Sequence, residues 1–219
     1  MWAAYLLGES TLISPERWAD DIDPASIAAT GTTDDYCNLP TLILAKIVNL
    51  IAGGLQSPAT TDINALWSNL QAWRDHRPRQ ALPLLRTNGR STFPDVLHAS
   101  DSSVCGSTFY HTGCLLLLRT GQVHRDSVGV ETETYDQLWH ANELCGVSII
   151  NTSHASWVNQ VYPLYIAGQA FGPVNGEEDN EEHAAKKIAL LKHLAKIERE
   201  TGWPTASKAA DLRRLWELE

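Results

Sequence analysis

Apolar residues recur every three or four positions along almost the whole chain, which is the spacing of an α-helix. In the segment that begins at Asp62, for example, Ile63, Leu66, Leu70 and Trp73 fall on one helical face. No alternating run of strand length stands between turn residues. The pattern therefore predicts an all-α fold, with seven to nine helices packed as antiparallel pairs in a single domain that spans residues 1–219.

Capping residues, prolines and glycines set the expected ends of these helices. Asn38 is placed to cap the first convincing helix, Pro40 suits its first turn and Gly53-Gly54 end it. Pro163 predicts a kink in a later helix. The segment from Pro78 to Pro94 is expected to be an irregular connector, and 172–180 a loop. The predicted helices cover residues 40–52, 62–77, 101–121, 133–150, 154–167, 181–201 and 205 onward.

The C-terminal end has the most specific pattern. Gly202 stands where a glycine ends a helix, Pro204 follows Trp203, and Thr205 or Ser207 is placed to cap the last helix. We expect a rigid corner that folds the last helix back on the preceding one. Trp203 and Trp216 are then expected to lie close together as buried, structural aromatic side chains.

Composition narrows the function classes. The chain has 219 residues, with 26 acidic against 17 basic side chains, and its formal charge of -9 argues against direct binding to nucleic acid. The densest basic stretch contains Arg74, Arg77 and Arg86, and we interpret it as a solvated loop. No apolar run reaches the length of a membrane span, and the start lacks a signal-peptide pattern, so we expect an intracellular chain with reduced thiols.

No short motif with a known chemical mechanism is present. The four cysteines form no C-x-x-C pair, and there is no glycine-rich phosphate loop, G-x-S-x-G elbow or H-E-x-x-H sequence. Two pairs, His111 with Cys114 and His140 with Glu143, offer only two ligands each, so we interpret them as core polar residues. The acidic segment Asp34–Asn38 is interpreted as a loop or helix cap. We expect no metal, no cofactor and no catalytic residue.

Four ordered phrases in the second half of the chain are more specific. The first joins Phe93-Pro94-Asp95 to a helix with Tyr110-His111-Thr112, and the second is Leu144-Cys145-Gly146-Val147. The third is Tyr165-Ile166-Ala167-Gly168, and the fourth runs from Ile197 through Thr201-Gly202-Trp203 to Asp211-Leu212 and Trp216. Together they resemble the fungal-specific transcription factor regulatory domain, the region that follows a zinc binuclear cluster. Trp67–Pro78, read as W-x5-W-R-x-x-RP, is similar to the central connector of that family.

The resemblance implies a role in transcriptional regulation in the nucleus, without catalysis. It implies partners that are other protein chains, either the transcription machinery or a homologous factor, and it allows a small-molecule effector whose binding residues it does not identify. The zinc-cluster cysteines, basic linker and coiled coil of the family have no counterpart here, so we expect no DNA contact by these residues. The family-motif residues, which the resemblance implies to be structural, are Phe93, Pro94, Tyr110, His111, Cys145, Gly146, Ala167, Gly168, Thr201, Gly202, Trp203, Asp211, Leu212 and Trp216.

Two alternatives stay open. The chain is either part of a zinc-cluster factor or a stand-alone interaction protein derived from that family. A third hypothesis, from another class, is an all-α enzyme that acts on a metal-dependent or isoprenoid-like substrate.

Overall fold

The computed structural model describes residues 1–17, 23–52, 60–88, 91–124, 132–172 and 181–218. Across these ranges the chain forms nine α-helices and one short antiparallel hairpin, which confirms the predicted all-α class. The helices are α1 (Trp2–Leu7), α2 (Pro24–Thr30), α3 (Thr33–Ala52), α4 (Thr60–Asp75), α5 (Asp101–Arg119), α6 (Gln137–Ile150), α7 (His154–Gln169), α8 (Glu181–Thr201) and α9 (Ala206–Leu215). The hairpin pairs β1 (Leu85–Thr87) with β2 (Asp95–Leu97), and short 3-10 turns cover Pro15–Arg17, Arg79–Ala81 and Thr132–Tyr135.

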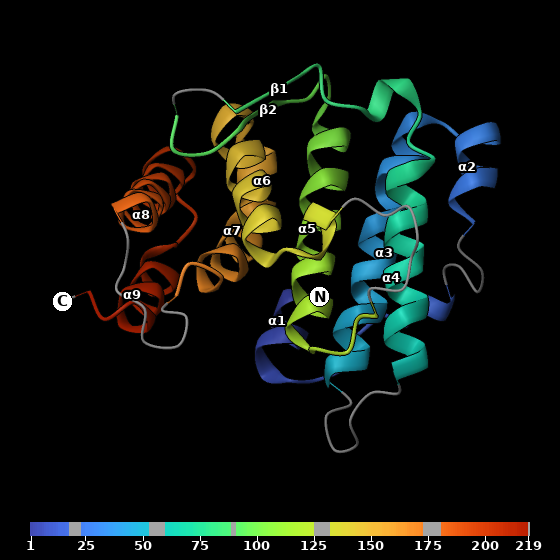
Figure 1. Cartoon of the computed structure of the whole chain (residues 1–219), viewed down its shortest axis with the longest axis horizontal. Helices are drawn as coiled ribbons and strands as arrows, with labels where there is room; N and C mark the ends of the chain where they lie inside the picture. The colour runs from blue at the N-terminus through green and yellow to red at the C-terminus, as the bar shows by residue number, and fades with distance from the viewer. Residues whose placement is uncertain (18–22, 53–59, 89–90, 125–131, 173–180, 219) are drawn as a thin grey trace.

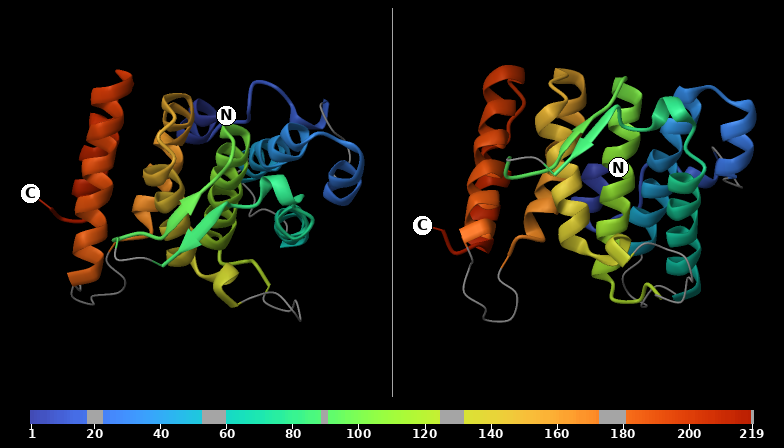
Figure 2. Two further views of the ribbon diagram at one scale, coloured as in Figure 1. Left: turned by 90° about the horizontal axis from the view of Figure 1, so that it is seen from above. Right: turned by 45° about the horizontal axis from the view of Figure 1, so that its top comes forward.

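The helices stand side by side in a row, with α5 at its centre (Figure 1). Helices α3 and α4 pack on one flank of α5, and α6 and α7 pack on the other. Helices α8 and α9 close the row beyond α7. Figure 2 shows the hairpin running across α5 and α6 at one edge of the molecule. Because α5 has neighbours on both flanks, its residues from Val104 to Leu117 are almost all buried.

The start of α3 differs from the prediction. The helix begins at Thr33 rather than Pro40, and Asn38 lies inside it instead of capping it. Thr32 and Asp35 form a reciprocal cap, since the Thr32 N–H donates to the Asp35 carboxylate (3.0 Å) and the Asp35 N–H donates to the Thr32 hydroxyl (3.1 Å). The helix-cap interpretation of the acidic segment is thus confirmed for Asp35, whereas its loop alternative is wrong.

Helix α3 tolerates its internal proline because another helix supplies the missing donor. Pro40 has no N–H, so the carbonyl of Tyr36, four residues earlier, loses its intrahelical partner. The indole N–H of Trp73 on α4 donates to that carbonyl (3.0 Å). In return, the Tyr36 hydroxyl donates to the Trp73 carbonyl in the last turn of α4. Each helix therefore satisfies a backbone group that the other leaves open.

Other boundaries were predicted with mixed success. Helices α5 and α8 and the start of α7 lie within two residues of the prediction, and α6 begins later, at Gln137, with the Asp136 carboxylate as its cap. The predicted connector contains the three-residue strand β1, and its partner β2 begins just after it, so the absence of strands was wrong. Helices α1 and α2 were missed. The predicted stop at Gly53-Gly54 and residues 173–180 of the predicted loop lie outside the described residues. Among the described helices, none is long and apolar enough to cross a membrane.

A buried chain of side-chain hydrogen bonds joins α5, α6, α7 and α8, on the flank of α5 that faces away from α3 and α4. The side-chain Nε2–H of Gln160 on α7 donates to the Thr108 hydroxyl on α5 (2.9 Å). The Ser148 hydroxyl on α6 donates to the side-chain Oε1 of Gln160 (2.8 Å). Since this uses the only hydroxyl proton of Ser148, the Nε2–H of His193 on α8 must donate to the Ser148 oxygen (2.8 Å). His193 is thus a neutral donor, and burial lowers its pKa to about 4.

This network predicts an acid-dependent loss of stability. Between pH 6.5 and about 4 the unfolded His193 ring binds a proton that the native ring does not, so falling pH favours unfolding. One such group changes the free energy of unfolding by about 1.4 kcal/mol per pH unit. His193→Gln is expected to remove about that slope in urea unfolding followed across this range. His154→Gln is the control for replacing a histidine, because the His154 side chain is 61% exposed and lies outside this hydrogen-bond network. Equal slopes for wild type and His193→Gln would contradict the assignment.

Candidate functional site

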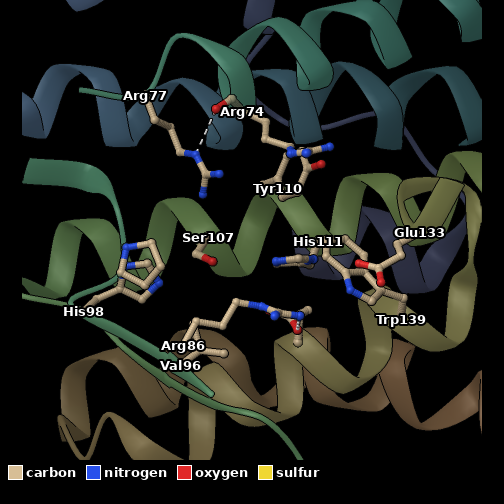
Figure 3. A pocket seen from close by; sticks show the side chains of 12 residues that line it. Arg74, Arg77, Arg86, Val96, His98, Ser107, Tyr110, His111, Glu133 and Trp139 are labelled. Carbon is tan, nitrogen blue, oxygen red and sulfur yellow. Dashed lines mark hydrogen bonds and ion pairs between the residues drawn. The ribbon is translucent and has the colours of Figure 1, made fainter. Parts of the chain in front are cut away.

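A polar cavity of about 290 Å³ lies where the end of α4, the middle of α5, the start of α6 and the hairpin meet (Figure 3). Its lining is rich in charged and aromatic side chains. The residues are Arg74, Arg77, Pro83, Arg86, Val96, His98, Ser107, Tyr110, His111, Glu133, Trp139 and Glu143.

Two arginines enter the cavity from the end of α4. The Nε of Arg77 donates to the carbonyl of Arg74 (2.9 Å), and its guanidinium lies 5.6 Å from the centre of the Trp73 ring. Burial lowers the pKa of Arg77. Arg77 has no ion-pair partner within the part of the chain that the structure describes. The interpretation of this stretch as a solvated loop is therefore wrong for Arg74 and Arg77, which are both half-buried and line the cavity.

The third arginine is neutralised. Arg86 on β1 forms a bidentate ion pair with the Glu143 carboxylate on α6. Its Nε donates to Oε2 (3.1 Å) and a terminal nitrogen donates to Oε1 (2.7 Å). The Glu143 side chain is only 6% exposed, so this pair ties the hairpin firmly to α6. Asn151 makes a second tie, since its amide donates to the Val96 carbonyl (2.8 Å) and its side-chain oxygen accepts from the His98 N–H (3.0 Å).

His98 follows β2 and its ring lines the cavity. The residue is only 7% exposed, and neither ring nitrogen has a hydrogen-bond partner among the described residues. Burial, aided by the charge of Arg77, lowers its pKa to about 4. The ring is therefore neutral near pH 7, with one donor nitrogen and one acceptor nitrogen.

His111 lies in the middle of the cavity wall and is held in one tautomer (Figure 3). The Nε2–H of His140 donates to the Thr134 carbonyl (2.8 Å), so His140 Nδ1 must accept. The Nδ1–H of His111 is then the donor in the 2.9 Å contact between the two rings, which makes His111 Nε2 an acceptor. Burial lowers the pKa of both rings, that of His140 to about 3.

The cysteines do not offer reactive thiolates. Burial raises the pKa of Cys37, Cys114 and Cys145, so these thiols stay protonated. Cys114 lies near Gln71 and His111 bonds His140, so the His111–Cys114 spacing does not form a ligand pair. No group of three or more metal-ligating side chains occurs in the described ranges. The cavity thus offers charge and hydrogen-bond donors.

The family-motif residues meet in two places. Pro94 lies against Gly146, where an added Cβ would stand 2.1 Å from the Pro94 carbonyl oxygen. Phe93 and Cys145 are buried beside them. At the other place Gly168 lies against Leu212, and the Trp216 indole donates to the Gly168 carbonyl (3.0 Å). Ala167 is fully buried next to Gly168, and Asp211 forms surface ion pairs with Lys208 and Arg214. Only Tyr110 and His111 of the motif set line the cavity.

The predicted corner between α8 and α9 is present, with one correction. Gly202 has a φ of +73°, as expected for a glycine that ends a helix, and the Thr201 hydroxyl donates to the Ile197 carbonyl (2.7 Å). Thr205 does not cap α9 with its side chain, because its hydroxyl bonds the Leu194 carbonyl and the Glu198 carboxylate instead. Trp203 is 46% exposed, so the expectation that it is buried beside Trp216 was wrong.

Comparison with known proteins gives one coarse indication of function. No family model and no solved structure matches the chain. A matching relative is "Transcription activator AMTR1" of Alternaria alternata, which is 24% identical over 221 aligned positions. The alignment covers 83% of this chain and 27% of the relative, so the chain spans about a quarter of that protein's length. This similarity supports transcriptional regulation in general terms and agrees with a region of a fungal transcription factor.

The close contact at Gly146 predicts that Gly146→Ala is destabilising. The new methyl group meets a backbone oxygen at 2.1 Å, so the Pro94 segment must shift at a cost of about 1–3 kcal/mol. Gly113→Ala is the control, because its methyl group would meet only the ends of the Leu70 and Ile47 side chains, at 3.0 and 3.1 Å. Its change should stay within about 1 kcal/mol, since alanine is the better helix former. Urea unfolding measures the stability of both variants. Equal losses of unfolding free energy would show that the contact between Gly146 and the Pro94 carbonyl oxygen does not restrict the side chain at position 146.

The two tryptophans of the tail should differ in their contribution to stability. Trp216 is 4% exposed and hydrogen-bonded, so Trp216→Ala is expected to cost about 3–5 kcal/mol. Trp203 is half-exposed, and Trp203→Ala should cost about 1 kcal/mol. Thermal and urea unfolding of the two variants compare them directly. A loss at Trp203 as large as that at Trp216 would contradict this ranking.

Proposed function

We propose that this chain is the regulatory region of a fungal zinc-cluster-type transcription factor, and that it responds to an effector bound in the polar cavity. The single observation behind the proposal is the cavity itself: a site lined by charged side chains in a chain similar to part of a transcription activator. The four family phrases support it further, because they fall at close packing contacts of the fold, Pro94 with Gly146 and Gly168 with Leu212.

In this proposal the chain does not read DNA and has no enzymatic activity. Its formal charge of -9 opposes binding to the phosphate backbone, so DNA must be held by another module. The chain acts in the nucleus by contacting other protein chains, either the transcription machinery or a homologous factor. Filling of the cavity changes those contacts, because the cavity wall includes α5 and α6, which lie at the centre of the helical row.

A tethered reporter assay in a fungal host tests this function. The chain fused to an unrelated DNA-binding domain is expected to change transcription from that domain's operator several-fold, and the untethered chain should leave it unchanged. Arg77→Gln should alter the effect of the tethered chain, since Arg77 lines the cavity. Arg79→Gln is the matched control, because Arg79 is exposed and outside the lining. A tethered, folded chain without effect on the reporter would overturn the proposal, as would an untethered chain that binds operator DNA specifically.

A further inference from the structure

We propose that the cavity binds a small organic anion, and that Arg77 holds its carboxylate group. This inference deepens the proposed regulatory function, on which its biological meaning rests, by assigning the chemical class of the effector.

The first support is the unused fork of the Arg77 guanidinium. Its Nε donates to the Arg74 carbonyl, but neither terminal nitrogen has an acceptor among the residues described. In Figure 3 the guanidinium extends toward the middle of the cavity, between the α4 end and Arg86. A half-buried arginine whose two parallel N–H groups lack acceptors presents the geometry that binds a carboxylate through two hydrogen bonds.

The second support is a pair of lining side chains whose buried hydrogen-bonding atoms lack partners among the described residues. Both ring nitrogens of His98 and the indole nitrogen of Trp139 are buried and lack partners in the described part of the chain. Buried polar groups are rarely left open in this way, and each one requires an explanation such as an absent ligand or ordered water. His98 is 93% buried and lies beside Arg77, since the charge of Arg77 helps to lower the His98 pKa. Arg77, His98 and Trp139 thus all present hydrogen-bond donors to the same cavity.

The charge of the lining favours an anion. Three arginines face two glutamates, and the most buried of these charges, Glu143, is already paired with Arg86. Glu133 is exposed, and the histidines that line the cavity are neutral because their pKa values are lowered. Arg77, which has no ion-pair partner among the described residues, therefore contributes an uncompensated positive charge to the lining, where a partly buried anion gains more than it would in water.

The walls favour an organic molecule over an inorganic ion. Tyr110, Trp139 and Val96 contribute apolar surface to a space of about 290 Å³, near the lower end of the range for small-ligand sites. An ion such as phosphate would satisfy the donors but leave most of that space unfilled. A carboxylate attached to a compact apolar body fits both features.

An NMR titration of the purified chain with defined probes tests this inference. Sodium acetate, sodium benzoate and sodium phosphate are added separately at constant ionic strength, with sodium chloride as the reference. The indole resonance of Trp139 and the ring resonances of His98 are followed. Both carboxylates are expected to give saturable shifts, with benzoate binding about tenfold or more tightly than acetate because its ring covers apolar wall. Benzamide, which has the same ring without the charge, should give no saturable shift at the same concentrations.

Arginine variants separate recognition from general charge. Arg77→Gln should weaken benzoate binding by about tenfold or more, and Arg77→Lys, which keeps the charge but loses the fork, should also weaken it. Arg79→Gln, next along the same segment, should bind as wild type does. The inference is overturned if neither carboxylate gives a saturable shift in wild type, if phosphate alone does so, or if Arg77→Gln and Arg77→Lys bind benzoate unchanged.

The titration contains no DNA and no reporter, so it fails independently of the proposed function. A chain that binds benzoate through Arg77 but does not act on the reporter keeps this inference and loses the regulatory role. A chain that acts on the reporter but gives no carboxylate-dependent shift keeps the role and loses the anion.

Discussion

The reciprocal hydrogen bonds between Tyr36 and Trp73 position much of the rest of the structure. Pro40 deprives the Tyr36 carbonyl of its helical donor, and the Trp73 indole replaces that donor from the neighbouring helix. An open carbonyl in a buried helix costs as much as a lost hydrogen bond, so this contact fixes α4 in both position and rotation. Trp73 also packs on Tyr110 of α5, at 5.4 Å between ring centres. The end of α4 is thereby fixed over the flank of α5 from which the cavity opens.

The cavity exists because the cover of α5 changes from helix to hairpin. Along most of its length α5 is flanked by helices that fill the space with apolar side chains. Beside Ser107, Tyr110 and His111 the cover is instead the hairpin and the residues around it, which bring arginines and His98. Charged side chains need solvent or a partner, so they cannot close the gap as leucines would. The Arg86–Glu143 ion pair and the Asn151 hydrogen bonds hold the hairpin beside this part of α5.

Helix α6 connects the cavity to helices α7 and α8. Helix α6 supplies Trp139 and Glu143 to the cavity near its start, and its Ser148 bonds Gln160 of α7 and His193 of α8. These bonds have defined donors and acceptors, so a shift of α6 along its axis would break them. A ligand that moved Trp139 would therefore be felt at α7 and α8, which contribute no residue to the lining of the cavity.

Long helices were predictable from the sequence, whereas the site was not. Helix α5 was found because Asp101 marks its start and apolar residues repeat through Leu118. The start of α3 was missed because Pro40 leaves the Tyr36 carbonyl without its helical donor, and Trp73 supplies another through a contact across 37 positions that no local pattern shows. The strands, at three residues each, are too short to show an alternating pattern. The cavity joins residues from four separate segments, and its one sequence signal, the arginine cluster, equally fits a solvated loop.

The residues of the cavity divide by their relation to the family phrases. Arg74 and Arg77 belong to the W-x5-W-R-x-x-RP phrase, and Tyr110 and His111 belong to the first of the four others. Trp73 of the same connector phrase makes the hydrogen bond that positions the two arginines. His98, Trp139 and Glu143 lie outside every phrase. A domain built in this way keeps the guanidinium end of its cavity coupled to the packing of α3 against α4. The remaining wall, from the hairpin and α6, is free to change without disturbing that packing. Recognition of a charged group and recognition of the body attached to it thus depend on physically separate parts of the fold.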